Sequence, residues 1–244
     1  MTNTESLTRP RPVERTVTLH FGAIRRGFAF LDEGNVSEEL QRIVAGRTYP
    51  LIAADVLRPR LIIDIGAHVG AATVTFAHAY PGVPVRAYEP SAGSFALLAR
   101  NTAGLSGVTV KHCGLLDESG RRTLHQGENH SMENTIVRIG ENGETIEVRP
   151  AREELADITD GPGVVLKIDT EGCEVPILRD LSRLLDNVDL IYLEYHSDAD
   201  RREIDKLLGE RFVLATARAE RPHLGELQYL STRLAARIPE IATP

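Results

Sequence analysis

Residues 64–70, Asp-Ile-Gly-Ala-His-Val-Gly, constrain the fold more than any other segment of the chain. The first two of them are also the last two of an almost wholly apolar run, 61–65. Such a run is typical of a β-strand covered on both faces. Apolar residues then recur at helical spacing from Val69 to Tyr80. The glycines permit a tight turn and a close approach of a ligand to the backbone, and the helix that follows offers unbonded N–H groups. The segment therefore predicts a strand–turn–helix unit with a ligand-binding loop at the carboxyl end of the strand.

Strand-like and helix-like patterns alternate along the rest of the chain. Strands are predicted at 61–65, 83–88, 107–113, 163–168 and 188–195, with helices at 69–80, 91–105, 175–185 and from the end of the fifth strand to about 208. Two further strands, 211–217 and 226–231, are expected to be antiparallel. This alternation predicts an α/β fold with a doubly wound, mostly parallel sheet and helices on both faces.

The chain divides into two predicted parts. Residues 1–59 contain a polar tail, a hairpin at 13–31 and two short helices, one beginning at Ser37 and one at 51–56. Residues 60–244 form the ligand-binding domain. Within it, turn-rich residues 115–150 interrupt the alternation, and we interpret them as an inserted hairpin region near the active-site end.

Bulk properties exclude several classes of protein. The chain has 244 residues, 42% of them hydrophobic, and a formal net charge of −7, which argues against a general nucleic-acid binder. No apolar run approaches the roughly 20 residues that span a bilayer, and the N-terminus lacks the apolar stretch of a signal peptide. Cys113 and Cys173 lie far apart and are predicted to be buried thiols. We expect a cytoplasmic protein without a membrane or nucleic-acid partner, and a homo-oligomer remains open.

The spacing of the loop separates two classes of nucleotide cofactor. A dinucleotide fingerprint, G-x-G-x-x-G, fails because His68 and Ala71 occupy its second and third glycine positions. The D-x-G-x-x-x-G spacing instead resembles the first motif of S-adenosylmethionine-dependent methyltransferases. The predicted cofactor contacts in this loop are Asp64, Gly66, Ala67, His68 and Gly70. A purely structural glycine turn is the alternative.

Further cofactor contacts are predicted at the ends of the next two strands. Glu89 ends the second strand, where an acid can accept hydrogen bonds from both hydroxyls of a ribose. Pro90 and Ser91 follow it directly. Gly114 follows the third strand, near where an adenine edge would lie.

Polar side chains follow the fourth and fifth strands. Asp169 and Glu171 come after the fourth, and Glu194 and His196 end the fifth. Parallel strands would bring these four residues to one rim of the sheet, where a carboxylate–imidazole group suits proton removal from an attacking hydroxyl or amine. We predict all four as catalytic, with Asp169 also near the cofactor. The alternative is that Lys167 pairs with Glu194 or Asp169 and that His196 caps a helix.

A metal ion is a separate question. Asp169, Glu194 and His196 form a reasonable ligand set for a hard cation, but their spacing does not demand one. The metal assignment is left unknown, and a divalent metal is not favoured.

Four segments, IDIGAHVG, AYEPSAGSFALLARN, KIDTEGCE and LEYH, in this order and spacing, resemble the FkbM family of methyltransferases. The resemblance covers roughly residues 61–196. It implies the class I methyltransferase (Rossmann-like) fold: a seven-stranded sheet with a C-terminal antiparallel strand pair and a small N-terminal extension. It also implies S-adenosylmethionine as cofactor, bound through Asp64, Gly66, Ala67, Gly70 and Glu89. The acceptor side would be lined by Asp169, Glu171, Glu194 and His196. Asn129 and Ser131 match a place where family members often have a polar turn, and the resemblance assigns them no role.

Many members of that family methylate sugar or macrolide hydroxyls in bacterial secondary metabolism, including antibiotic biosynthesis. The expected function is therefore O-methylation of a small-molecule acceptor. N-methylation of an amino sugar or other small amine is the alternative, and a non-catalytic cofactor-binding scaffold is a third hypothesis from a different class. A nucleic-acid methyltransferase is disfavoured, because DTEG stands where an Asn-Pro-Pro-aromatic element would follow the fourth strand.

Overall fold

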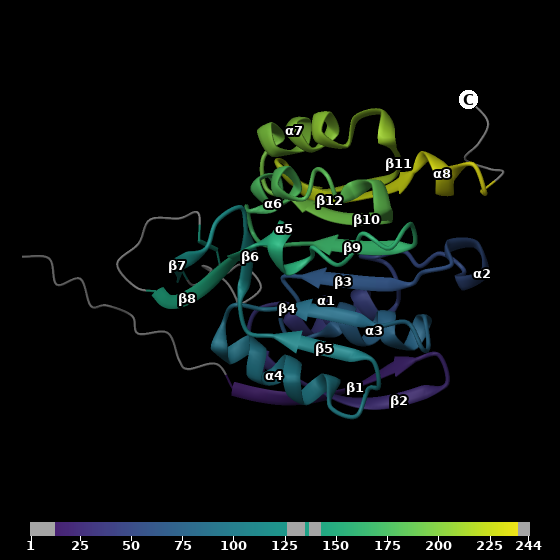
Figure 1. The fold of residues 1–244 in the computed structure, drawn as a ribbon. Helices are drawn as coiled ribbons and strands as arrows, with labels where there is room; N and C mark the ends of the chain where they lie inside the picture. Colours follow the sequence, from purple (N-terminus) through teal and green to yellow (C-terminus); the bar gives the residue numbers. More distant parts are fainter. Residues whose placement is uncertain (1–12, 126–134, 137–142, 239–244) are drawn as a thin grey trace, which may run out of the picture.

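The computed structural model describes residues 13–125, 135–136 and 143–238, and its centre is a seven-stranded sheet (Figure 1). The strands lie in the order β11-β12-β10-β9-β3-β4-β5. Their bounds are β3 (Leu61–Ile65), β4 (Val85–Tyr88), β5 (Val108–Lys111), β9 (Val164–Ile168), β10 (Val188–Tyr195), β11 (Phe212–Arg221) and β12 (Leu224–Ser231). The five strands from β10 to β5 are parallel, whereas β12 is antiparallel to both of its neighbours. The predicted fold class is confirmed by this order.

Helices cover both faces of the sheet (Figure 1). They are α1 (Val36–Val44), α2 (Ala54–Leu57), α3 (Ala71–Ala79), α4 (Ala92–Thr102), α5 (Ala151–Glu154), α6 (Glu174–Asp180), α7 (Asp198–Leu208) and α8 (Thr232–Ala235). The sequence missed α5, and it extended α6 to residue 185. In the structure, the chain after α6 forms tighter i to i−3 hydrogen bonds, such as Leu184 N to Leu181 O. It then reverses direction before β10 begins at Val188.

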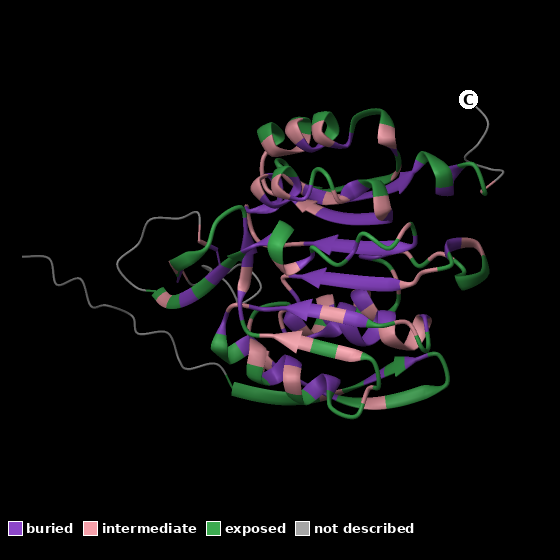
Figure 2. Cartoon of the chain, in the orientation of Figure 1, coloured by how far each residue is buried: buried purple, intermediate pink, exposed green. Residues whose placement is uncertain are grey.

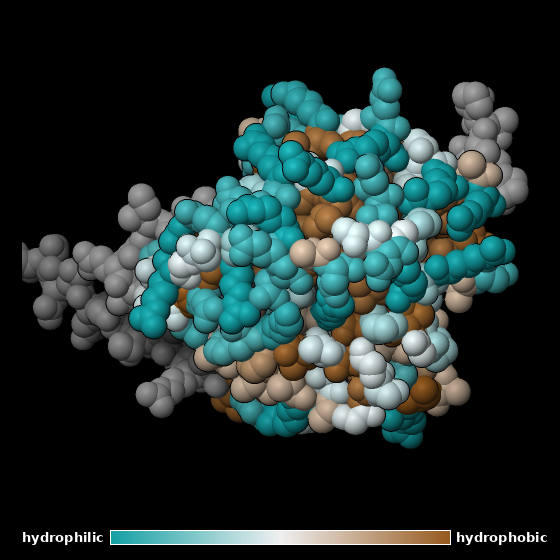
Figure 3. All heavy atoms as spheres, viewed as in Figure 1, coloured by the Kyte–Doolittle hydropathy of each residue, from teal (hydrophilic) through white to brown (hydrophobic). Residues whose placement is uncertain are grey.

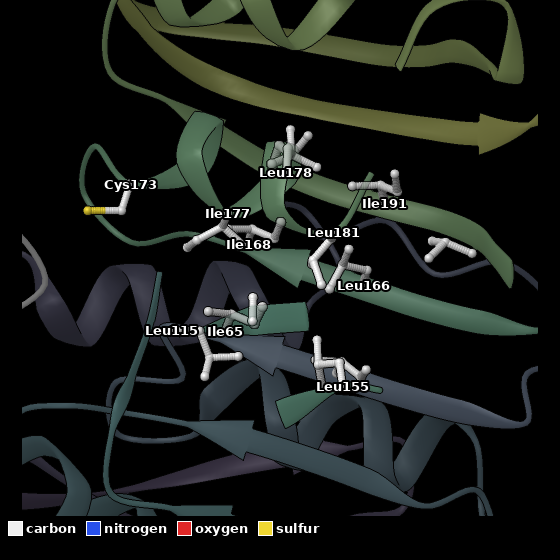
Figure 4. Packing of buried hydrophobic residues seen from close by; sticks show 14 of the residues in the cluster. Ile65, Leu115, Leu155, Leu166, Ile168, Cys173, Ile177, Leu178, Leu181 and Ile191 are labelled. Carbon is white, nitrogen blue, oxygen red and sulfur yellow. The ribbon is translucent and has the colours of Figure 1, made fainter. Parts of the chain in front are cut away.

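Alternate side chains of each central strand enter two separate hydrophobic clusters. Ile63 and Ile65 of β3 pack with α6, whereas Ile62 packs on the opposite face with α1 and α3. Every residue of β3 and β9 is buried (Figure 2). Figure 4 shows the α6 face, where Ile177 and Leu178 lie close to the strands. The apolar runs in the sequence therefore reflect a sheet that is covered on both sides.

The N-terminal hairpin, β1 (Val13–Phe21) and β2 (Ile24–Asp32), belongs to the same core as the sheet face under α3. Phe28 and Phe30 are buried there. The side chain of Asn101 in α4 holds the backbone N–H and C=O of Ala29 at 2.9 and 2.8 Å. α1 begins at Val36, one residue before the predicted start at Ser37, and Asn35 is its N-cap. The division of the chain at residue 60 stays a prediction, since hairpin and sheet share one core.

The insert forms a small sheet of its own at the carboxyl ends of the central strands (Figure 1). Its strands are β6 (Gly114–Leu116), β7 (Gly120–His125) and β8 (Gly143–Pro150), in the order β6-β8-β7. The pairing of β7 with β8 is the predicted hairpin, and β6 adds a parallel strand that the sequence did not indicate. Leu124, Ile146 and Val148 face the α6-side cluster. Asn129 and Ser131 lie outside the described residues.

Hydrophilic side chains are densest over the insert sheet and around α7 on the face shown in Figure 3. Among the described helices, none is both long and apolar enough to cross a membrane. Cys113 and Cys173 are buried free thiols, as predicted.

Candidate active site

A cleft of about 760 Å³ opens at the carboxyl ends of the parallel strands. It is bounded by the loops after β3, β4, β9 and β10, by the insert sheet, by α1 with the chain that follows it, and by the turn between β11 and β12. Of the predicted site residues, Gly66, His68, Glu89, Pro90, Gly114, Asp169, Glu171, Glu194 and His196 line it. Asp64, Ala67, Gly70 and Ser91 are not among the residues that line it. The structure thus brings the two predicted halves of the site, cofactor loop and strand-end rim, to one cavity.

The glycine loop is clamped between neighbouring strands. Gly66 has a φ of +78°, and a Cβ atom there would lie 1.8 Å from the carbonyl oxygen of Asp169. The N–H groups of Gly66 and Ala67 both donate to the carbonyl of Tyr88 at 3.0 Å. Gly70 has a φ of +93°, and a Cβ atom there would lie 2.7 Å from Leu98 of α4. Both glycines are therefore required by the geometry as well as by the turn.

Asp64 supports the loop from behind. It is fully buried, accepts a hydrogen bond from Thr73 at 2.6 Å and lies 3.0 Å from the Lys167 ammonium. Lys167 also donates to the carbonyl of Gly66 at 2.8 Å and lies 3.7 Å from Asp169. Because Asp64 and Lys167 are register partners on β3 and β9, this pair fixes the loop to the fourth strand. Asp64, which the sequence did not suggest as a partner, is the nearest carboxylate to Lys167, and Asp169, one of the two partners that the sequence alternative named, is the second.

Glu89 lies at the end of β4 with its carboxylate fixed by backbone donors. His68 N donates to Oε2 at 2.8 Å, and Ser91 N donates to Oε1 at 2.9 Å. Burial raises the pKa of Glu89 to about 7, although these two amides act in the opposite direction. Each oxygen uses one lone pair on an amide and keeps another for a ligand hydroxyl. His68 reaches this position with a left-handed φ of +49°, so it shapes the loop around Glu89.

Gly114 and its neighbours form the next part of the wall. A Cβ atom at Gly114 would lie 3.2 Å from Val148 and 3.5 Å from Pro90, so a side chain there would crowd the cleft. His112 stacks on Phe95 and lies 3.0 Å from the carbonyl oxygen of Pro90. Ser91, which begins α4, bonds to Glu144 of the insert. This bond joins the insert to the loop between β4 and α4.

Asp169 and Glu194 form a close carboxyl pair. Leu193 of β10 is the register partner of Ile168 of β9, so the residues after them are neighbours. Burial and the adjacent charge of Asp169 raise the pKa of Glu194 well above its usual value. Burial also disfavours the charge on Asp169, but Lys167 and the hydrogen bonds from Glu194 and Tyr49 hold the pKa of Asp169 below its usual range. A proton shared by the pair is therefore favoured on Glu194 over Asp169.

His196 lies among three glutamates. Its Nε2 is 2.9 Å from Glu171 and 3.7 Å from Glu194, and its Nδ1 is 3.6 Å from Glu174. Burial disfavours the charged ring, but the contacts with Glu171 and Glu174 outweigh it and raise the pKa of His196 to about 12. The ring is thus an imidazolium at neutral pH.

Glu174 and Tyr49 are site residues to which the sequence assigned no role. Glu174, 1% exposed, accepts the N–H groups of Thr170 and Gly172 and shapes the loop after β9. Its place in the KIDTEGCE segment was the available signal. Tyr49 donates to Asp169 Oδ2 at 2.7 Å from a part of the chain that carries no site motif.

Three of the rim residues have the geometry to share a cation. One ligand atom from each of Glu171, Glu194 and His196 lies within 4.8 Å of the others. Glu171 takes the place of Asp169 in the set considered from sequence, because Asp169 is turned towards Tyr49 and Lys167. His196 Nε2 lies 2.9 Å from Glu171, but both ring nitrogens are buried and make no hydrogen bond within the described part of the chain. The arrangement is compatible with a cation and does not require one, so the metal assignment is left unknown.

The strand order, the glycine loop after β3 and the buried acid after β4 together define a protein of the class I methyltransferase fold. Comparison with known proteins narrows this class further. The methyltransferase FkbM domain matches residues 64–222, and the chain belongs to the FkbM methyltransferase family.

Two curated relatives illustrate its similarity within that family. The chain is 31% identical over 150 residues to methyltransferase sdnD of Sordaria araneosa, covering 60% of this chain and 54% of that protein. It is 26% identical over 128 residues to the hexuronic acid methyltransferase AglP of Haloferax volcanii, covering 52% and 53%. The chain spans about half the length of these relatives. Among solved structures, it matches a ribosomal protein L11 methylase from Lactobacillus delbrueckii at 14% identity and a TM-score of 0.40, covering 73% of this chain and 76% of that one.

Proposed function

We propose that the protein transfers the methyl group of S-adenosylmethionine to a hydroxyl of a small molecule of the sugar, polyol or macrolide type. The observation that carries this proposal is Glu89, whose two carboxylate oxygens each keep a free lone pair beside the glycine loop. A ribose presents two adjacent hydroxyls, which match two acceptor oxygens fixed side by side. Family membership supports the same reaction class.

Bound S-adenosylmethionine supplies an electrophilic methyl group on a sulfonium. In the proposed reaction Asp169 would accept the acceptor's hydroxyl proton as that oxygen takes up the methyl group. Asp169 suits this role better than His196, because the ring of His196 already carries its second proton between Glu171 and Glu174. The strand-end rim would hold the acceptor in line with the methyl group, and such positioning contributes much of the rate.

The similarity to a hexuronic acid methyltransferase of Haloferax volcanii favours a sugar-like acceptor. N-methylation of an amino sugar or other small amine is the second candidate. It is favoured by the acidic lining of the cleft, which includes Glu39, Asp169, Glu171, Glu194, Glu220 and Glu226. A non-catalytic scaffold would bind the cofactor but methylate neither class of acceptor.

Replacement of Glu89 by alanine is expected to weaken binding of S-adenosylmethionine and S-adenosylhomocysteine by at least about 100-fold, because two hydrogen bonds to a charged group are lost. Titration calorimetry measures both affinities. In the wild-type protein we expect affinity to fall as the pH drops below about 7, where Glu89 becomes protonated. That pH dependence should be absent from the variant.

Glu144→Ala is the matched control. Glu144 also accepts hydrogen bonds from the start of α4, at Ser91 Oγ and Ala92 N, but it does not line the cleft. Its replacement should leave cofactor affinity within about threefold. Wild-type protein that binds neither compound would refute the cofactor assignment.

Replacement of Asp169 by asparagine is expected to lower kcat at least about 100-fold while cofactor affinity changes little, because the proton acceptor is lost. Turnover would be followed by methyl-group radiolabel with a fixed mixture of glucuronic acid, myo-inositol and glucosamine as acceptors. His196→Ala should have a smaller effect. If the double variant, Asp169→Asn with His196→Ala, retains full turnover, neither residue takes the proton.

A further inference from the structure

Tyr49 lies in the chain between α1 and α2, outside the family match at 64–222. Its side chain is 6% exposed, and its ring packs edge-on against Tyr192 with 5.5 Å between the ring centroids. Its hydroxyl donates to Asp169 Oδ2 at 2.7 Å. A residue of the N-terminal segment thus contacts the proposed proton acceptor directly.

The chain around Tyr49 is held in place by other contacts. The hydroxyl of Tyr192 donates to the carbonyl of Pro50 at 2.5 Å, and Gln228 Nε2 donates to the same oxygen at 3.1 Å. Tyr80 donates to the carbonyl of Ile52 at 2.8 Å. Because these three bonds fix the backbone at residues 50–52, the Tyr49 hydroxyl is not needed for that purpose.

The surroundings of Asp169 explain what the phenol adds. The titratable groups that act on Asp169 include Glu39, Tyr49, Lys167, Glu171, Glu194 and His196. Tyr49 and Lys167 both approach Oδ2, at 2.7 and 3.7 Å, so these two groups hold one oxygen of the carboxylate. Burial and the nearby carboxylates raise the pKa of Tyr49 well above its usual value, so the phenol remains a donor. A single O–H can serve one acceptor, and here that acceptor is Asp169.

We propose that Tyr49 is a positioning residue for methyl transfer: its hydroxyl fixes the orientation of the Asp169 carboxylate towards the acceptor. This rests on the proposed function, in which Asp169 receives the acceptor's proton. Tyr49 keeps its own proton throughout and touches neither reacting atom. The N-terminal segment, which lies outside the matched domain, therefore completes the acceptor side of the active site.

Tyr49→Phe tests the proposal, because it removes the hydroxyl and keeps the ring. We expect kcat with the glucuronic acid, myo-inositol and glucosamine mixture to fall about tenfold, with KM for S-adenosylmethionine unchanged. In protein labelled with ¹³C at the aspartate carboxyl carbons, the Asp169 resonance at pH 7 should move, since its hydrogen-bond donor is gone. Asp169→Asn assigns that resonance.

Tyr192→Phe is the matched control, since it removes a buried hydroxyl that anchors the same segment at Pro50. It should leave kcat within about twofold and the Asp169 resonance in place. An equal loss of kcat in both variants would assign the effect to anchoring and overturn the positioning role. If the wild-type protein turns over and Tyr49→Phe leaves both kcat and the Asp169 resonance unchanged, the positioning role is overturned and the proposed function stands. Absence of wild-type turnover would overturn the proposed function, and the positioning role with it.

Discussion

Gly66→Ala is expected to destabilise the protein by about 4 kcal/mol or more and to abolish cofactor binding. The new methyl carbon would lie 1.8 Å from the carbonyl oxygen of Asp169, so the loop and the fourth strand cannot both keep their positions. That oxygen is backbone and has no rotamer to move away. Thermal unfolding should show a midpoint lowered by about 10 °C, and calorimetry should show no binding of S-adenosylmethionine.

Gly82→Ala separates the clash from the backbone strain. Gly82 has a similar φ of +84°, but a Cβ atom there would meet nothing within 4 Å. Its replacement should cost only about 1 kcal/mol, the penalty of the left-handed conformation for an L-residue. Equal destabilisation in the two variants would show that the loop relaxes away from Asp169, contrary to the rigid clamp described above.

Lys167→Met is expected to destabilise the protein by about 3 to 5 kcal/mol, because it leaves the fully buried Asp64 carboxylate without its cation. The Lys167 side chain is 3% exposed and Asp64 is 0% exposed. Chemical denaturation measures the loss. Lys111→Met is the comparison: the ammonium of Lys111 pairs with Glu154 at the surface, and removing it should cost less than about 1 kcal/mol.

A second substitution tests the cause of that loss. Asp64→Asn added to Lys167→Met removes the buried Asp64 charge that has lost its cation. The double variant should recover part of the stability, since the two residues share one interaction. If the double variant is as unstable as the sum of the single variants, the lysine stabilises the fold through packing rather than through charge.

The positions of the main strands along the chain and the common rim of site residues were predictable from sequence. Apolar runs marked the buried strands, and parallel strands necessarily end at one edge of the sheet, so Asp169 and Glu194 were expected together. The glycine loop was recognisable because Gly66 and Gly70 occupy positions that other residues cannot. These features depend on local patterns.

Pairings across long sequence distances were not predictable in the same way. Lys167 faces Asp64 because the two share a register position on β3 and β9, and local patterns do not set the register of strands about a hundred residues apart. Tyr49 reaches Asp169 over 120 residues of sequence from a segment without a motif. The third strand of the insert sheet escaped notice because β6 is only three residues long.

The position of β12 between β10 and β11 has a consequence for how the chain folds during synthesis. Of the described strands, β12 is synthesised after all the others, yet it is hydrogen-bonded to both neighbours, which do not pair with each other. Until residue 231 has emerged, β11 has no place in the sheet and one edge of β10 stays open. Exposed strand edges recruit other chains. The nascent chain therefore keeps this edge open to other chains until β12 has been made, and a fragment that stops at residue 222, the end of the family match, would keep it open permanently.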